Sequence, residues 1–177
     1  IILTLPARIT SWKGQDDFII LLKKITEKNP NVHGLIVGEE KNKARFINKL
    51  KSQTTILGLT NNLTFVGHRS DIKEIMSISK IVFSLSREPE AFGRISLESL
   101  SMGIPVIAYS HGGVKEQMLE ILPEGLIAVG NINLVASLTN KWIKKGPEIK
   151  KSHNFTLKNM LEKTVLVYKQ AIKDKCQ

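Results

Sequence analysis

The sequence has little cysteine, few aromatic residues and no long apolar run. Its 177 residues include one cysteine, and aromatic residues make up 6% of the chain. Cys176 has no partner for an internal disulfide, which is typical of a protein in a reducing compartment. No stretch approaches the roughly eighteen consecutive apolar residues of a transmembrane helix, and no leader-like segment opens the sequence. We therefore expect a cytoplasmic protein without a membrane span or a signal peptide.

The common nucleotide- and metal-binding motifs are also missing. No two of the twelve glycines stand two residues apart, so the G-x-G-x-x-G dinucleotide fingerprint is absent, and no Gly-Lys pair exists to form a P-loop. The sequence has no Asp-x-Asp and no Cys-x-x-Cys, and its four histidines lack ligand spacing. We expect no bound metal and no cofactor, so protein cations would have to neutralise any bound phosphate.

Composition predicts one domain with a basic surface. Apolar residues make up 42% of the chain, which is enough for a core, and the length is usual for a single domain. The formal net charge of +10 raises the question of nucleic acid, because clustered Lys and Arg bind phosphates. Here the basic residues are spread over several helical stretches without interleaved aromatic residues. We expect no nucleic-acid partner; attraction to an anionic membrane surface, worth about 1 kcal/mol per exposed basic residue, is the alternative to a simply solvated surface.

Short apolar runs alternate with helical stretches along the chain. The runs are rich in Ile, Val and Leu and too short for helices, and they lie at 1–5, 35–37, 63–66, 81–85, 104–108 and 126–129. Helical spacing of apolar residues occurs at 16–28, 43–57, 71–78, 94–102 and 133–144. This alternation predicts an α/β fold, a Rossmann-like three-layer arrangement with a parallel sheet and helices on both faces. Ligands of such sheets bind beyond the carboxyl ends of the strands, so functional residues should directly follow strands.

The segment ARITSWKGQ, after the first predicted strand, contains two cations and a glycine. The side chains of Arg8 and Lys13 could converge on a diphosphate, and Gly14 would allow a close approach of backbone. An ordinary solvated loop with two cations is the alternative, and this segment alone does not decide between them.

The segment EPEAFGRISLE, at 88–98, places acids on both sides of a predicted helix start. Gly93 and Arg94 mark the junction, and a helix start offers free N–H groups and the positive end of the macrodipole to a phosphate. Glu98, one turn into the helix, and Glu90, in the loop, each carry a carboxylate that can accept hydrogen bonds from two neighbouring hydroxyls of a ribose or another sugar. A pair of ordinary surface acids is the alternative.

Taken together and in order, these motifs resemble the C-terminal nucleotide-binding domain of the retaining family 4 glycosyltransferases, which have the GT-B fold. The resemblance runs over nearly the whole chain, up to a closing helical segment at 152–175. The matches are 8–14 (RITSWKG) to the family's Arg-x4-Lys-Gly, 65–67 (FVG) to Phe-x-Gly, 90–98 (EAFGRISLE) to Glu-x7-Glu, 102–108 (MGIPVIA) to small-Gly-x-Pro-Val and 111–116 (HGGVKE) to Gly-Gly-x-x-Glu.

The resemblance implies a domain, residues 1–177, that binds a nucleoside diphosphate sugar, with UDP-sugar favoured over GDP-sugar. The full-length enzyme would transfer the sugar with retention to a glycan or lipid-linked acceptor in cell-envelope polysaccharide or lipopolysaccharide synthesis, in the cytoplasm or peripherally on the inner face of the membrane. Such enzymes place the acceptor site mainly on an N-terminal domain. We therefore expect this chain to be an excised half that is inactive alone and whose segment 152–175 packs toward that domain. A GT-B epimerase or phosphorylase, or a non-catalytic nucleotide-sugar-binding domain, would share the architecture.

The resemblance also implies roles for single residues. Arg8 and Lys13 would meet the charge of the leaving diphosphate in a front-face displacement without a metal, and Glu90 would orient the hydroxyls of the transferred sugar. Glu98 would bind the ribose. The other implied donor-binding residues are Gly14, Gly67, His68, Arg69, Ala91, Phe92, Gly93, Arg94 and Ile95. Two positions depart mildly from the family pattern, Ala91 and Asn131, while Arg94 adds a cation that could tighten donor binding or recognise an acidic sugar.

Overall fold

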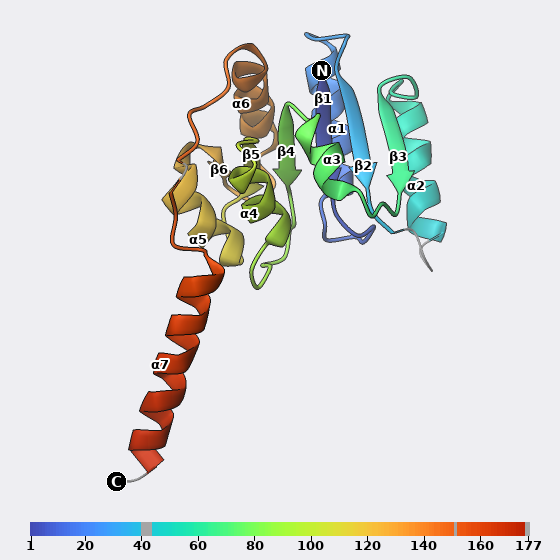
Figure 1. Ribbon diagram of the computed structural model, residues 1–177. Helices are drawn as coiled ribbons and strands as arrows, with labels where there is room; N and C mark the ends of the chain where they lie inside the picture. Colours follow the sequence, from blue (N-terminus) through green and yellow to red (C-terminus); the bar gives the residue numbers. More distant parts are fainter. Residues whose placement is uncertain (40–43, 151, 176–177) are drawn as a thin grey trace.

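One parallel sheet lies between two layers of helices in the computed structural model, which describes residues 1–39, 44–150 and 152–175 (Figure 1). The strands are β1 (Ile2–Pro6), β2 (His33–Val37), β3 (Leu63–Gly67), β4 (Ile81–Ser84), β5 (Val106–Tyr109) and β6 (Leu126–Ile127). They form a six-stranded sheet in the order β3-β2-β1-β4-β5-β6, and every neighbouring pair is parallel. The predicted α/β fold is confirmed.

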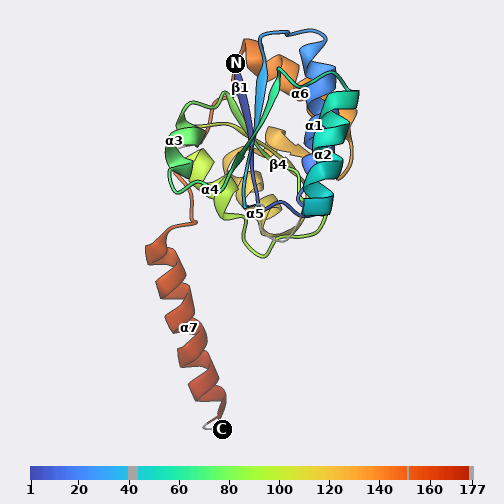
Figure 2. The same cartoon turned by 90° about the vertical axis from the view of Figure 1, so that its right-hand side faces the viewer.

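The helices divide between the two faces of the sheet. Their bounds are Gln15–Thr26 (α1), Ala44–Ile56 (α2), Ile72–Ser77 (α3), Arg94–Ser101 (α4), Gly112–Ile121 (α5), Ile132–Lys144 (α6) and Leu157–Lys175 (α7), with a 3-10 turn at Pro123–Gly125. Helices α1, α2 and α6 cover one face, and α3, α4 and α5 cover the other (Figure 2). Both faces of the sheet are therefore buried, which explains why its strands read as short continuous apolar runs.

Apolar residues of strands and helices form one core. Leu3 and Leu5 of β1 are buried, as are Phe18 and Leu22 on the sheet-facing side of α1. Phe18 packs against Phe83 of β4, with ring centroids 5.4 Å apart. Full burial of each such side chain contributes roughly 1.5–3 kcal/mol, so this packing fixes α1 against the centre of the sheet.

Three strands are shorter than predicted. β4 ends at Ser84 rather than at 85. β5 begins at Val106 rather than at 104, because Pro105 has no N–H to donate to a sheet ladder. β6 ends at Ile127; Val129 is exposed, and the chain turns at Gly130, whose φ is +77°. The residue at which the second helix was predicted to begin, Lys43, lies outside the described residues, as does Cys176.

The strand order reverses at β1, which pairs with β2 on one side and with β4 on the other. In open parallel sheets this reversal leaves a crevice beyond the carboxyl ends of the two central strands, because their following segments turn to opposite faces. The segments that leave β1 and β4, residues 7–14 and 85–93, carry the motifs that the sequence singled out. The fold therefore places them side by side.

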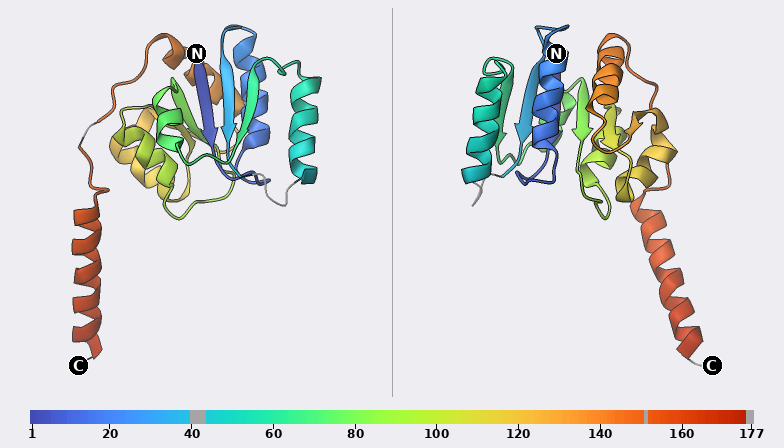
Figure 3. Two further views of the ribbon diagram at one scale, coloured as in Figure 1. Left: turned by 45° about the vertical axis from the view of Figure 1, so that its right-hand side comes forward. Right: turned by 180° about the vertical axis from the view of Figure 1, so that it is seen from behind.

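Helix α7 extends away from the sheet and its covering helices (Figures 1 and 3). It forms the greater part of the predicted closing segment, 152–175, and its residues from 160 to 174 are exposed. Its packing against a second domain stays a prediction. No helix in the described part of the chain is both long and apolar enough to cross a membrane.

Candidate functional site

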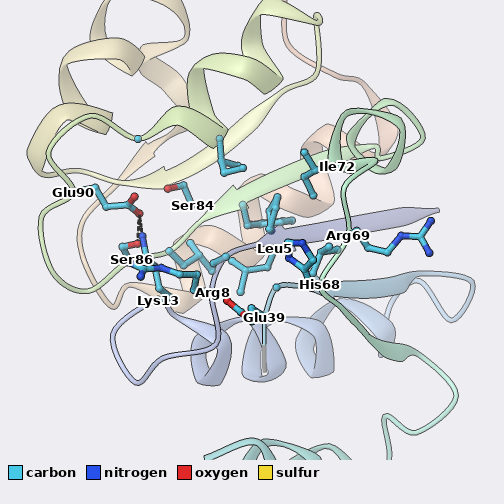
Figure 4. A pocket seen from close by; sticks show the side chains of 18 residues that line it. Leu5, Arg8, Lys13, Glu39, His68, Arg69, Ile72, Ser84, Ser86 and Glu90 are labelled. Carbon is cyan, nitrogen blue, oxygen red and sulfur yellow. Dashed lines mark hydrogen bonds and ion pairs between the residues drawn. The ribbon is translucent and has the colours of Figure 1, made fainter. Parts of the chain in front are cut away.

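A cavity of about 450 Å³ opens at the carboxyl ends of β1 and β4 (Figure 4). Its floor is apolar and includes Leu5, Val37 and Phe83, while charged and polar side chains line its rim. The rim residues are Arg8, Lys13, Glu39, His68, Arg69, Ser84, Ser86 and Glu90. An apolar floor with convergent polar groups is the usual form of a small-molecule site.

The loop after β1 is held tightly against the loop after β4. Gly14 begins α1 with a φ of +79°, and a Cβ at this position would lie 2.1 Å from the carbonyl oxygen of Leu85. The side-chain amide of Gln15 donates to the carbonyl oxygen of Arg8 at 2.9 Å, which ties the start of the loop to its end. Position 14 therefore requires glycine, both for its positive φ and because a side chain would clash with the backbone of Leu85.

Lys13 and Glu90 meet across the cavity rim. Lys13 Nζ lies 2.8 Å from Glu90 Oε1, and the hydroxyl of Ser86 donates a short hydrogen bond to the same oxygen (Figure 4). The two charged side chains are 12% and 23% exposed, so water screens them only in part. Lys13 Nζ also lies 4.2 Å from the centroid of the Trp12 ring, a cation–π contact that helps to fix its position.

The loop between β4 and α4 is held from its other side by the start of α5. The amide of Gly113 donates to the carbonyl oxygen of Glu90 at 2.8 Å, and the side-chain amide of Gln117 donates to that of Phe92. His111 Nε2 lies 2.6 Å from the carbonyl oxygen of Ser86. Gly112 and Gly113, at the start of α5, thus let this helix approach the loop that carries Glu90, because a Cβ at Gly112 would lie 2.6 Å from the carbonyl oxygen of Glu90.

The start of α4 faces the same cavity. Gly93 caps the helix with a φ of +81°, and both Gly93 and Ile95 line the cavity. The first intrahelical amide bond runs from Leu97 to the Gly93 carbonyl, so the amides of the first turn have no intrahelical acceptor. These groups and the helix dipole favour an anion at this end of α4.

Arg94 and Glu98 form a separate pair one turn along α4. Arg94 Nη2 donates to Glu98 Oε1 at 3.1 Å, and the two side chains are 82% and 27% exposed. The pair has the i, i+4 spacing of facing helix residues. Arg94, the cation that is additional to the family pattern, therefore contacts Glu98, the second acid of the same motif.

The segment after β3 closes the far side of the cavity. Gly67 has a φ of +77°, and the next two residues, His68 and Arg69, line the cavity. Arg69 Nε donates to Asp71 Oδ1 at 2.7 Å. The hydrogen bonding between these two side chains raises the pKa of Arg69 and lowers the pKa of Asp71 from their ordinary values. The guanidinium is thereby oriented by a partner that is two residues away.

The sequence model of the family described as Glycosyl transferases group 1 matches residues 1–162. The chain belongs to this family. Its fold is shared with glycosyltransferases of the GT-B type. A glycosyltransferase from Rickettsia africae ESF-5 superposes with a TM-score of 0.87 at 31% identity, covering 97% of this chain and 48% of that one. HepE of Anabaena, in a crystal structure with UDP-glucose, superposes with a TM-score of 0.74 at 31% identity, covering 81% of this chain and 39% of that one.

Among curated proteins, this glycosyl transferases group 1 chain is similar to a trehalose synthase from Pyrococcus horikoshii. The two are 26% identical over 176 residues, which cover 95% of this chain and 41% of that protein. The chain thus spans less than half the length of this relative and of the two solved structures.

The structure brings together seven of the residues that the sequence singled out in this glycosyl transferases group 1 domain. The cavity is lined by Arg8, Lys13, His68, Arg69, Glu90, Gly93 and Ile95. The other six are not among the residues that line it: Gly14 and Gly67 turn the backbone, Arg94 and Glu98 pair on α4, and Ala91 and Phe92 are exposed in the loop between β4 and α4. Their roles in binding and catalysis stay predictions.

The sequence reasoning missed several further residues that line the cavity. Ser86 donates to Glu90, and Glu39, Ile72 and Ser84 also line the cavity. Ser86 and Glu39 each lie two residues beyond the last residue of a strand, which is the position where ligand-binding residues are expected in a parallel sheet. That signal was present in the sequence, but it does not separate these residues from other polar residues near strand ends.

Proposed function

We propose that the chain is the donor-binding, C-terminal half of a retaining family 4 glycosyltransferase and that its cavity binds a nucleoside diphosphate sugar. The observation that carries the proposal is the meeting of Lys13 and Glu90, from the loops after β1 and β4, beside the start of α4. A cation and a helix start suit a diphosphate, and a carboxylate suits sugar hydroxyls. The crystal structure of HepE with UDP-glucose supports a UDP-sugar as the donor, with a GDP-sugar second.

The proposed chemistry follows from the charges around the cavity. Departure of the nucleoside diphosphate leaves negative charge on its outer phosphate, which Arg8, Lys13 and the amides at the start of α4 would stabilise. Glu90 would orient the hydroxyls of the transferred sugar. The acceptor hydroxyl would attack on the side of the leaving group, and the diphosphate would take its proton, so the configuration of the sugar is retained. The acceptor, a glycan or a lipid-linked glycan of the cell envelope, would be bound by a second domain toward which α7 packs.

A thermal-shift screen of UDP-, GDP- and ADP-sugars tests this function. A ligand at one hundred times its dissociation constant stabilises a fold by about 2.7 kcal/mol, which is readily measured as a rise in melting temperature. We expect the largest rise with a UDP-sugar. The proposal would be abandoned if no nucleotide or nucleotide sugar raised the melting temperature.

Binding of UDP is expected to be independent of a divalent cation, because Arg8 and Lys13 would neutralise the diphosphate in place of a metal. Among the described residues, no group of three or more His, Cys, Asp or Glu side chains could hold a metal ion. Calorimetric titration of UDP should give the same dissociation constant with Mg²⁺ and with excess EDTA. Loss of binding in EDTA would contradict it.

Replacing Glu98 with glutamine is expected to weaken UDP binding by about 1.5–3 kcal/mol, because a charge-assisted acceptor of the ribose hydroxyls is lost. Glu27→Gln is the matched control, since Glu27 also belongs to an i, i+4 pair, with Lys23 at 3.8 Å, on a helix end distant in sequence. Calorimetry with UDP should show a loss for Glu98→Gln alone. If the two variants bound UDP with equal affinity, Glu98 would be an ordinary surface residue of α4 and would not bind the ribose.

A further inference from the structure

A buried carboxylate lies beneath the two loops that form the cavity rim. Asp17, in the first turn of α1, is 1% exposed. Arg87 Nε donates to its Oδ2 at 3.0 Å, Arg87 Nη2 donates to its Oδ1 through a short hydrogen bond, and the hydroxyl of Tyr109 donates to Oδ2 at 2.8 Å. The three side chains come from α1, from the loop after β4 and from β5. They form the Asp17–Arg87–Tyr109 network.

The network joins a buried carboxylate to a partly solvated guanidinium, since the side chain of Asp17 is 1% exposed and that of Arg87 is 54% exposed. The pairing satisfies the charge of Asp17, and it also restricts where the side chain of Arg87 can lie. The fork of Arg87 matches the carboxylate with two parallel hydrogen bonds, which fixes distance and angle together. The hydrogen bond to Asp17 raises the pKa of Arg87. Burial is the main cause that raises the pKa of Tyr109, and the hydrogen bond to Asp17 is the second. Both partners therefore keep their protons, and the arrangement persists over the neutral pH range.

The backbone of Arg87 links the two loops whose side chains meet at the rim. Its backbone amide donates to the carbonyl oxygen of Trp12 at 2.7 Å, and Trp12 precedes Lys13. On its other side it follows Ser86, whose hydroxyl donates to Glu90. Arg87 thus joins the loop of Lys13 to the loop of Glu90 through its backbone, while its side chain anchors both to α1.

We infer that Asp17, Arg87 and Tyr109 are positioning residues that hold Glu90 at the distance from Lys13 at which one donor molecule can contact both. The inference rests on the proposed function, in which Lys13 binds the diphosphate and Glu90 binds the transferred sugar. A positioning role predicts a selective defect: binding of the sugar part should suffer more than binding of the nucleotide, because Glu90 contacts the sugar directly and affects the nucleotide only through its ion pair with Lys13.

The test compares UDP and UDP-glucose by calorimetry on the wild-type chain and on Arg87→Met, Arg87→Lys and Tyr109→Phe. Arg87→Met should lower the ratio of UDP-glucose affinity to UDP affinity by about tenfold, since small displacements of a positioned group have large effects on binding geometry. Arg87→Lys keeps the charge but not the fork and should lower the ratio by about threefold. Tyr109→Phe keeps the Arg87–Asp17 contact, so it should lower the affinity ratio less than Arg87→Met does.

A second background separates positioning from general loosening of the fold. In a Glu90→Gln background, Arg87→Met should leave the UDP-glucose to UDP ratio almost unchanged, because the group that it positions no longer carries its charge. A further fall of the ratio in that background would overturn the inference, as would equal losses of UDP and UDP-glucose in Arg87→Met itself. If Arg87→Met does not fold, as judged by circular dichroism, the affinity ratio of Arg87→Lys is measured instead, both in the otherwise wild-type chain and in the Glu90→Gln background.

The outcomes also separate this inference from the function on which it rests. If the wild-type chain binds neither UDP nor UDP-glucose, the UDP-sugar function is wrong and the inference falls with it. If the wild-type chain binds both and the Arg87 variants keep the wild-type ratio, the function stands and the positioning role is wrong.

Discussion

Gly14→Ala is expected to destabilise the chain by about 3–5 kcal/mol, an unusually large loss for the addition of one methyl group. The new Cβ would lie 2.1 Å from the carbonyl oxygen of Leu85 and 2.7 Å from its carbonyl carbon. Both are backbone atoms, so the clash is relieved only if the loops after β1 and β4 move apart. The φ of +79° adds strain of about 1–2 kcal/mol. Urea unfolding, followed by circular dichroism, measures the loss.

Gly130→Ala is the matched control for this substitution. Gly130 has almost the same backbone angle, with a φ of +77°, and an added Cβ would meet nothing within 4 Å among the described residues. Its loss should therefore be the angular strain alone, about 1–2 kcal/mol. Equal losses for the two variants would show that the loops can separate freely, and the tight contact between Gly14 and Leu85 would not be a constraint on the site.

The fold could be predicted from the sequence because its signals are local. The apolar runs at 35–37 and 63–66 fall within β2 and β3, and the helical spacing at 16–28 corresponds to α1. Each signal is contained within one element and follows from burial on both faces of a parallel sheet. The ends of the strands were less accurate, as β5 and β6 show, because they depend on one proline and one turn.

The composition of the cavity was partly predictable, and its contacts were not. A rule about strand ends places Lys13 and Glu90 near the same edge of the sheet, but it says nothing of their separation. The hydrogen bond from Ser86 and the network around Asp17 join residues far apart in sequence, so they depend on how the strands are ordered and on which loops touch. Asp17 reads in the sequence as one more acid in the first turn of a helix, where acids are common. Only its burial distinguishes it.

Lys13→Met and Glu90→Gln are expected to change UDP binding in opposite directions. Lys13→Met removes a cation from the diphosphate and should weaken UDP by about 2–3 kcal/mol. A carboxylate that contacted only the sugar would have no effect on free UDP. Glu90, however, lies 2.8 Å from Lys13 Nζ, so a diphosphate would compete with Glu90 for this cation. Glu90→Gln should therefore strengthen UDP by about 0.5–1 kcal/mol, the usual worth of a partly exposed ion pair, while it weakens UDP-glucose.

The double variant Lys13→Met/Glu90→Gln decides whether this gain arises from the ion pair. Without Lys13 there is no cation to release, so adding Glu90→Gln to Lys13→Met should not strengthen UDP binding, apart from the small effect of removing one negative charge near the phosphates. Calorimetry with UDP on the wild type, the two single variants and the double variant gives the coupling energy directly. If Glu90→Gln strengthened UDP equally in both backgrounds, the gain would come from reduced repulsion alone. Lys13 and Glu90 would then act on the donor independently, and the contact between them would have no part in binding.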